Sequence, residues 1–288
     1  MKTKITKAVI PAAGFGTRLL PGTKAQPKEM LVVLDKPVIQ HVVEEAVQSG
    51  ITDILIIISE GKEVLKTHFR PDEALEKLLE EKGKHKELEA IRSLNHLANI
   101  QYVYQHEQKG LGDAVLCAEK FVGDKPFAVL LGDTIIEAVK PLTLQLAEVY
   151  ELIENPVVSL QEVPLVIAHR YGVFVGDKVK ERLFSGTELI EKPPVGKSPS
   201  NLVFSGRYVL TPDIFEALRH TKPGVNNEIQ LTDAIRMLMA HRKVYGWAFD
   251  GKRHDVGNKL DFIKTNVLFG LKNKEIGEEL REWLRLEL

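Results

Sequence analysis

A glycine-rich turn with basic residues close by is the clearest chemical signal in the sequence. The segment Pro11–Arg18 directly follows a short apolar run, and Lys28 stands ten residues further on. Small residues let backbone N–H groups approach an anion closely, and a guanidinium adds a charged fork for phosphate oxygens. A dinucleotide fingerprint would need a third glycine where Leu19 stands, and the Gly-Lys-Ser/Thr ending of a P-loop is missing. The turn therefore predicts a phosphate-binding loop and makes a dehydrogenase a distant alternative.

A carboxylate follows one of the apolar runs. Asp133 ends the segment Phe127–Asp133, where a carboxylate at the C-terminal end of a strand suits Mg²⁺, which takes few protein oxygens and keeps water and phosphate ligands. The alternative is an aspartate that simply starts a turn. The nine histidines show no metal-ligand spacing, and the single cysteine, Cys117, excludes an intramolecular disulfide and a cysteine-only metal site.

The elements that must position these residues alternate between strands and helices. Apolar positions at helical spacing predict a helix over 38–48, and charge-dense residues 72–92 predict two surface helices separated by Gly83. Short apolar runs predict buried strands at 7–10, 54–58, 100–104 and 127–131. Repeated βα units of this kind indicate a Rossmann-like α/β fold, with a mostly parallel mixed sheet flanked by helices.

The pattern changes in the second half of the chain. Prolines and glycines separate strand-like pieces at 157–163, 171–175, 202–210 and 244–249, with helices expected near 212–219 and 229–241. This change predicts an inserted region on the C-terminal half of the sheet. Ile276, Leu280, Trp283 and Leu284 follow at helical spacing, so we expect an amphipathic C-terminal helix. The helix packs on its own chain or contacts a second subunit.

Composition narrows the class of protein. Of 288 residues, 44% are hydrophobic, and 39 Lys and Arg against 40 Asp and Glu give a net charge of −1. The chain lacks the basic field typical of nucleic-acid binders, so we expect no nucleic-acid partner. No window approaches a membrane-spanning helix, and the basic start lacks a small-residue cleavage site. We therefore expect no membrane partner and a cytoplasmic location.

A string of residues after the turn carries a family resemblance. Thr23-Lys24-x-x-Pro27-Lys28-Glu29-Met30 is not required by any secondary structure. Seven further segments follow it in order, at residues 35–40, 110–112, 131–133, 191–193, 206–210, 228–233 and 255–257. Together these segments resemble those of the bacterial UTP–glucose-1-phosphate uridylyltransferases, in the sugar-nucleotidyltransferase superfamily. The resemblance extends to about residue 271.

The resemblance implies an activity and an organisation. In the implied reaction, a phosphate oxygen of glucose 1-phosphate attacks the α-phosphorus of UTP, giving UDP-glucose and pyrophosphate. The implied cofactor is Mg²⁺. It also implies the nucleotide-diphospho-sugar transferase fold over residues 1–271, with a nucleotide-binding part at about 1–135 and a sugar-binding part at about 136–256. Residues 272–288 would form a helical tail. Many members are homodimers or homotetramers, so we expect a homo-oligomer.

The resemblance also implies roles for individual residues of this chain. Arg18 and Lys28 would bind the triphosphate, and Lys192 would neutralise the attacking phosphate; the three are the implied catalytic residues. Asp133 and Asp255 would hold the metal. The implied nucleotide-binding residues are Ala12, Ala13, Gly14, Gly16, Gln105 and Gly110. The implied sugar-phosphate-binding residues are Gly172, Glu191 and Lys192.

Two positions depart from the family, and two other functions compete. Thr134 stands where many relatives have a second aspartate, and Asp113 stands where a histidine is usual; we expect Asp113 to be a helix N-cap.

One rival function is a nucleotidyltransferase that uses dTTP or another hexose 1-phosphate. The other is a non-catalytic sensor of nucleotides or sugar phosphates on the same fold.

Overall fold

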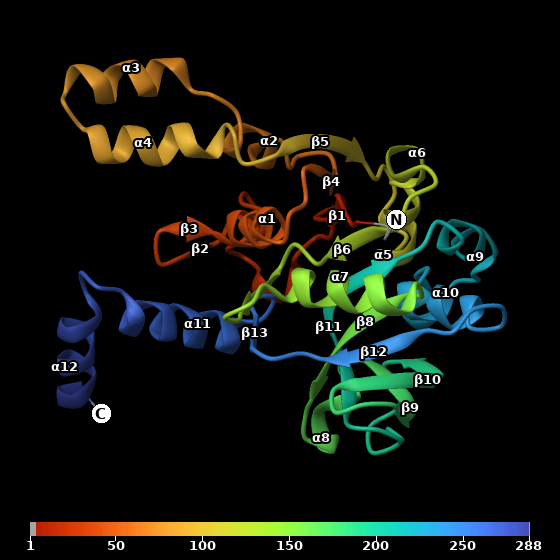
Figure 1. The fold of residues 1–288 in the computed structure, drawn as a ribbon. Helices are drawn as coiled ribbons and strands as arrows, with labels where there is room; N and C mark the ends of the chain where they lie inside the picture. The colour runs from red at the N-terminus through yellow and green to blue at the C-terminus, as the bar shows by residue number, and fades with distance from the viewer. Residues whose placement is uncertain (1–3, 288) are drawn as a thin grey trace.

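The computed structural model describes residues 4–287 as helices packed around one mixed sheet (Figure 1). The strands of this sheet are β1 Lys7–Pro11, β4 Asp53–Ile58, β5 Asn99–Tyr104, β6 Phe127–Leu130, β8 Val157–Glu162, β9 Gly172–Lys178, β10 Leu183–Glu191, β11 Leu202–Leu210 and β12 Tyr245–Ala248. They hydrogen-bond in the order β5-β4-β1-β6-β11-β8-β12-β10-β9. The α/β class predicted from the alternation of strands and helices is confirmed.

The first half of the sheet is parallel. Strands β5, β4, β1 and β6 all run in the same direction, and runs such as 54–58 are buried because helices cover both faces. Two segments continue from the C-terminal ends of these strands. The N–H of Ala12 donates to the carbonyl of Ile57, and the N–H of Gln105 donates to the carbonyl of Ile58. The glycine-rich turn and Gln105 therefore lie at the same edge of the sheet.

The second half of the sheet is mainly antiparallel. β11 is antiparallel to β6, β8 and β9, and β10 is antiparallel to β12 and β9, while β12 and β8 are parallel. The pairing of Val203 with Val173 closes a ring of five strands. β10 was not predicted, because Gly186 and several polar residues interrupt its apolar pattern; its pairing shifts register between Gly186 and Glu188.

A separate two-stranded ribbon lies beside the main sheet. Its strands, β7 Thr134–Glu137 and β13 Lys252–Asp255, are antiparallel, and Thr134 pairs with Asp255. Asp133 directly precedes β7. The ribbon therefore brings together two aspartates that are far apart in the sequence. A second short ribbon pairs β2 Val32–Val33 with β3 Lys36–Pro37.

Helices cover the two faces of the main sheet and enclose two hydrophobic cores. One face carries α5 Leu111–Leu116, α6 Glu119–Val122, α9 Ile214–His220 and α10 Leu231–Leu238, and the other carries α1 Val38–Gln48, α2 Val64–His68 and α7 Leu142–Ile153. The short α8 spans Leu165–Ala168, and the 3-10 turns η1, η2 and η3 span Thr17–Leu19, Lys28–Met30 and Val225–Asn227. The predicted helix over 38–48 is confirmed; α7 was not predicted.

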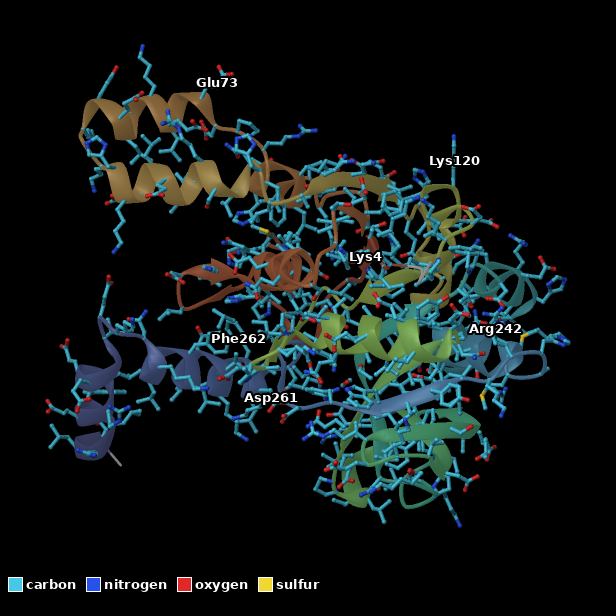
Figure 2. The ribbon with its side chains drawn as sticks, viewed as in Figure 1. Lys4, Glu73, Lys120, Arg242, Asp261 and Phe262 are labelled. Carbon is cyan, nitrogen blue, oxygen red and sulfur yellow. The ribbon has the colours of Figure 1, made fainter. Side chains whose placement is uncertain are left out.

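Two helical arms project from the body (Figure 1). One is the hairpin of α3 Glu73–Glu81 and α4 His85–Leu94, which Gly83 separates as predicted. None of the side chains on α3 is buried (Figure 2), and Lys86 of α4 forms an ion pair of 3.2 Å with Glu275, near the C-terminus. The other arm is α11 Lys259–Lys272 followed by α12 Gly277–Glu287. The tail helix was predicted, whereas α11 was not. Among residues 4–287, no helix has the length and apolar character needed to cross a membrane.

Candidate active site

A buried ion pair joins two of the predicted site residues. The ammonium of Lys28, in η2, lies 2.6 Å from Oδ2 of Asp133, and both side chains are less than one-fifth exposed. Burial by itself would raise the pKa of the Asp133 carboxyl, but Lys28 and Arg18 hold that pKa below its usual value. Burial likewise opposes the charge on Lys28, yet Asp133 and Glu29 keep the pKa of Lys28 raised. The surroundings of both groups therefore favour their charged forms, and their ion pair lies below the surface.

Three predicted residues converge on the backbone of Gly257. A Cβ placed on Gly257 would lie 3.0 Å from Nη2 of Arg18, 3.1 Å from Oδ1 of Asp255 and 3.3 Å from Oδ2 of Asp133. Backbone bonds fix this corner, since the N–H of Val256 donates to the carbonyl of Asp133 and that of Gly257 donates to Oδ1 of Asp255. The structure therefore brings both aspartates and the arginine to one point.

The two carboxylates fit a divalent metal that retains other ligands. Within residues 4–287, no cluster of three or more His, Cys, Asp or Glu side chains could hold a metal ion. Mg²⁺ is held by one or two carboxylates together with water and substrate phosphates. Asp133 and Asp255 supply that donor set.

A buried arginine donates hydrogen bonds to the backbone on both sides of Asp133. Arg207, on β11, is 1% exposed, and its guanidinium forms an ion pair of 2.7 Å with Glu45 of α1. The same guanidinium donates to the carbonyls of Leu131 and Thr134, on either side of Asp133, at 3.3 and 2.8 Å. In the sequence, Arg207 stood out only as part of the segment 206–210, because the partner of a cation on a buried strand appears only in three dimensions.

The glycine-rich turn lies against Lys28. A Cβ placed on Gly14 would lie 3.9 Å from the Lys28 ammonium, and Gly16 adopts a left-handed backbone with φ of 67°. Ala12 and Ala13 are buried, while Gly14 is exposed. The turn therefore presents its backbone beside a cation, as a phosphate-binding loop requires.

A lysine that was not predicted contacts this turn from inside. The ammonium of Lys62 donates to the carbonyls of Ala12 and Gly14 at 2.6 and 2.7 Å, and to Oε2 of Glu29 at 2.9 Å. Burial lowers the pKa of Lys62, and Glu29 opposes that shift. The sequence signal would have been a single lysine directly after the buried strand β4 and Gly61.

The predicted base-binding residues form a second group. Nε2 of Gln105 donates to Oδ2 of Asp113 at 2.7 Å and to the carbonyl of Gly110 at 3.2 Å. The expectation that Asp113 caps a helix is wrong: α5 begins at Leu111, so Asp113 lies inside its first turn and accepts from Gln105. A Cβ on Gly110 would lie 2.8 Å from the carbonyl oxygen of Ile229, so this loop is packed against the other half of the chain.

The predicted sugar-binding residues form a third group. Gly172 and Glu191 pair across β9 and β10, and a Cβ on Gly172 would lie 3.1 Å from Oε2 of Glu191. The hydroxyl of Thr232, on α10, donates to that oxygen at 2.6 Å. Lys192 has a positive φ of 41°, and its ammonium lies 3.1 Å from Oε1 of Glu191. The carboxylate is thus oriented from two sides.

One arginine connects the metal-binding corner with the sugar group. Arg253, on β13, lies 3.8 Å from Oδ2 of Asp255 and places its guanidinium 4.5 Å from the centre of the Tyr171 ring. Tyr171 directly precedes Gly172, and its carbonyl accepts from the N–H of Lys192 at 3.1 Å. Arg253 was not predicted as a site residue, because its contact with Tyr171, which is far away in the sequence, appears only in the structure.

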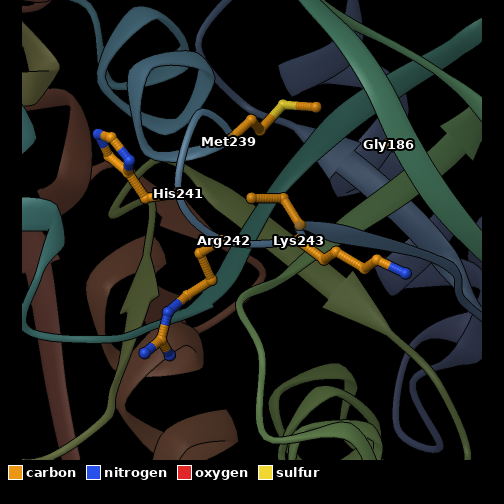
Figure 3. A pocket seen from close by; sticks show the side chains of 6 residues that line it. Gly186, Met239, His241, Arg242 and Lys243 are labelled. Carbon is orange, nitrogen blue, oxygen red and sulfur yellow. The ribbon is translucent and has the colours of Figure 1, made fainter.

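The predicted site residues do not line the surface pocket between α10 and β12. A pocket of about 250 Å³ lies where α10 ends and β12 begins, and Figure 3 shows the side chains that line it. Its lining residues are Gly186, Met239, His241, Arg242, Lys243 and Val244. None of them belongs to the three groups described above.

Known proteins match this chain over nearly its full length. The model of the nucleotidyl transferase family matches residues 7–269. The UTP–glucose-1-phosphate uridylyltransferase of Staphylococcus haemolyticus is 49% identical over 282 residues, covering 98% of each chain. This chain belongs to the nucleotidyl transferase family, among its UTP–glucose-1-phosphate uridylyltransferases. Nucleotidyltransferases of this family typically use a divalent metal ion.

Solved structures of the family have the same fold. A UTP-bound UDP-glucose pyrophosphorylase from Acinetobacter baumannii is 37% identical, with a TM-score of 0.90 over 99% of both chains. A UDP-glucose pyrophosphorylase complexed with UDP-glucose is 38% identical, with a TM-score of 0.87, and covers 93% of this chain and 100% of its own. The family fold expected from the sequence motifs is confirmed.

Proposed function

We propose that this chain transfers the uridylyl group of UTP to glucose 1-phosphate, giving UDP-glucose and pyrophosphate. The observation that carries the proposal is the convergence of Arg18, Asp133 and Asp255 on Gly257, with Lys28 paired to Asp133. A sensor would need to bind a nucleotide but would have no need for metal-binding and pyrophosphate-facing groups together. The relatives named as uridylyltransferases support UTP and glucose 1-phosphate as the substrates.

The reaction is a single in-line displacement. A phosphate oxygen of glucose 1-phosphate forms a bond to the α-phosphorus of UTP, and the bond from that phosphorus to the bridging oxygen of pyrophosphate breaks. No group of the protein needs to be modified, so catalysis comes from positioning and from neutralising charge. Arg18 and Lys28 bind the triphosphate in this proposal, and Lys192 binds the attacking phosphate.

Asp133 and Asp255 would hold Mg²⁺ in this site. When bound, the ion neutralises charge on the triphosphate and on the departing pyrophosphate. Lys28 and Arg18 hold the pKa of the Asp133 carboxyl below its usual value, which favours the ionised form that a metal ligand needs. Arg207 fixes the backbone on both sides of Asp133, which limits how far the carboxylate can move.

The remaining groups recognise the two ends of the product. Backbone groups of Ala12, Ala13, Gly14 and Gly16, with Gln105 and Gly110, bind the nucleotide in this proposal. Both hydrogen bonds of the Gln105 side chain use its amide nitrogen, and an amide can accept as well as donate to a pyrimidine edge. In this proposal Glu191 accepts hydrogen bonds from sugar hydroxyls, and Gly172, whose missing Cβ lets Glu191 and Thr232 pack closely against its backbone, belongs to the same sugar-binding group. We assign residues about 1–135 to the nucleotide and about 136–256 to the sugar.

The substrates are tested by measuring pyrophosphate release. UTP or dTTP is combined with glucose 1-phosphate or galactose 1-phosphate, each with and without Mg²⁺. The proposal predicts fast, Mg²⁺-dependent release with UTP and glucose 1-phosphate. Faster release with dTTP would assign the chain to a thymidylyl-transferring branch. Binding of UTP without release from any pair would contradict catalysis and favour a sensor.

We also propose that the chain forms a homodimer or homotetramer through residues 259–287. The support is the exposed apolar surface of this arm, where Leu260 and Ile263 are 60% exposed and Trp283 is 54% exposed. Light scattering on the purified protein tests this, with Ile263→Lys as the disrupting variant. A monomer at all concentrations would contradict the proposal.

A further inference from the structure

Lys62 is a buried cation that the proposed reaction does not use. Its side chain is 9% exposed, and it follows β4 through the turn at Gly61. Its ammonium has three hydrogen-bond donors and makes three bonds, to the carbonyls of Ala12 and Gly14 and to Glu29. All its bonding capacity is therefore spent within the protein, and none is left for a substrate.

The partners of Lys62 are the two segments that carry the nucleotide-binding groups. Ala12 and Gly14 belong to the glycine-rich turn, and Glu29 is the neighbour of Lys28 in η2. Glu29 is 1% exposed, and its pKa is raised by burial against the opposing charges of Lys62 and Lys28. Lys62 thus ties the turn to the 3-10 segment from the side of the core.

The bonds from Lys62 also determine which way the N–H groups of the glycine-rich turn point. A trans peptide unit is planar, and its C=O and N–H point in opposite directions. Because Lys62 draws the carbonyls of Ala12 and Gly14 inward, the N–H groups of the next residues, Ala13 and Phe15, face away from it. The turn can present N–H groups to an anion or a base only while its peptides keep this orientation.

We propose that Lys62 is a positioning residue for the nucleotide: it sets the peptide orientation of the glycine-rich turn without touching the substrate. This inference rests on the proposed binding of UTP by that turn. The competing explanation is that Lys62 only neutralises the buried charge of Glu29. The two explanations differ in what happens when both charges are removed together.

Four proteins separate the explanations: the wild type, Lys62→Met, Glu29→Gln and the double variant. Glu29→Gln is the matched control, because Lys62 keeps its carbonyl bonds in that variant. The double variant removes both charges, and replacing a buried ion pair by uncharged groups of similar volume is often neutral for stability. It therefore provides a folded protein without Lys62 even if Lys62→Met fails to fold.

The measurements are the dissociation constant of UTP by calorimetry, the KM of each substrate, and Tm. We expect Lys62→Met and the double variant to bind UTP about 30- to 100-fold more weakly, because misplacing a binding group by about 1 Å has effects of that size. The KM for glucose 1-phosphate should stay within about threefold in both, and Glu29→Gln should bind UTP within about threefold of the wild type.

Three results would overturn the inference. They are UTP binding by Lys62→Met as tight as in the wild type, recovery of UTP binding in the double variant, or an equal rise in KM for both substrates. Failure of the wild type to bind or turn over UTP would instead contradict the proposed function, so the two failures are distinguishable.

Discussion

Substitution of Gly257 by alanine should inactivate the site while the protein stays folded. The added methyl group would lie 3.0 Å from Arg18, 3.1 Å from Asp255 and 3.3 Å from Asp133, all closer than an ordinary contact. These atoms are ends of side chains, and the φ of Gly257 lies outside the left-handed range. The side chains can therefore yield, and we expect the free energy of unfolding to change by less than about 1 kcal/mol.

The expected loss of activity follows from the same distances. Both carboxylates and the guanidinium must shift by a few tenths of an ångström, and the methyl group occupies the space between them. Mg²⁺ demands near-ideal octahedral geometry with oxygens at about 2.0–2.1 Å, so it tolerates little displacement. We expect kcat/KM to fall by about 100-fold or more, which corresponds to about 2.7 kcal/mol of transition-state stabilisation.

The assay is pyrophosphate release over a range of Mg²⁺ concentrations, with Tm measured alongside. Gly22→Ala serves as the control, since a Cβ on Gly22 would meet only the carbonyl oxygen of Leu19, at 3.4 Å. Activity of Gly257→Ala within about threefold of the wild type would refute the reasoning, because the three side chains would then not act together at this point. A large fall in Tm would show that the loss is one of folding.

Further substitutions probe the other groups. Asp133→Asn and Asp255→Asn should each abolish turnover with circular dichroism unchanged; near-wild-type rates in either would remove that residue from the metal site. Lys192→Ala should raise the KM for glucose 1-phosphate or lower kcat, and no change in both would end its assignment. Arg207→Met leaves Glu45 buried without its partner, so the free energy of unfolding in urea should fall by about 3–5 kcal/mol. A change below about 1 kcal/mol would contradict this estimate.

Local patterns in the sequence predicted the parallel half of the sheet well. The helix over 38–48 has its apolar residues on one face, and the run at 54–58 is continuously apolar, so each pattern fits one element. Both signals arise within a few residues of the chain. Each pattern indicates that an element is buried, without showing which other elements pack against it.

The antiparallel half and the assembly of the site depend on distant partners. β10 is nine residues long and was missed, because its polar residues and its register shift disrupt the alternation that marks a strand. The meeting of Asp133 and Asp255 depends on the pairing of β7 with β13, which join residues about 120 positions apart. The resemblance to the family named both aspartates, but their shared contact with Gly257 appears only in the structure.

Buried cations were the least predictable parts of the site. Lys62 and Arg207 each satisfy their donors with backbone carbonyls and one carboxylate, and these partners come from distant segments. A charged residue beside an apolar strand is usually exposed, so the sequence offers no sign of such an arrangement. Residue type alone therefore does not separate a cation that binds substrate from one that holds a loop.

Binding of Mn²⁺, as a spectroscopic probe for Mg²⁺, tests most directly whether Asp133 and Asp255 hold one metal ion beside the triphosphate. Electron paramagnetic resonance would count bound Mn²⁺ with UTP present, in the wild type and in folded Asp133→Asn and Asp255→Asn. We predict one ion per chain in the wild type and an affinity at least about tenfold lower in each variant, in line with the loss of a metal ligand. Unchanged affinity in both variants would contradict the central claim.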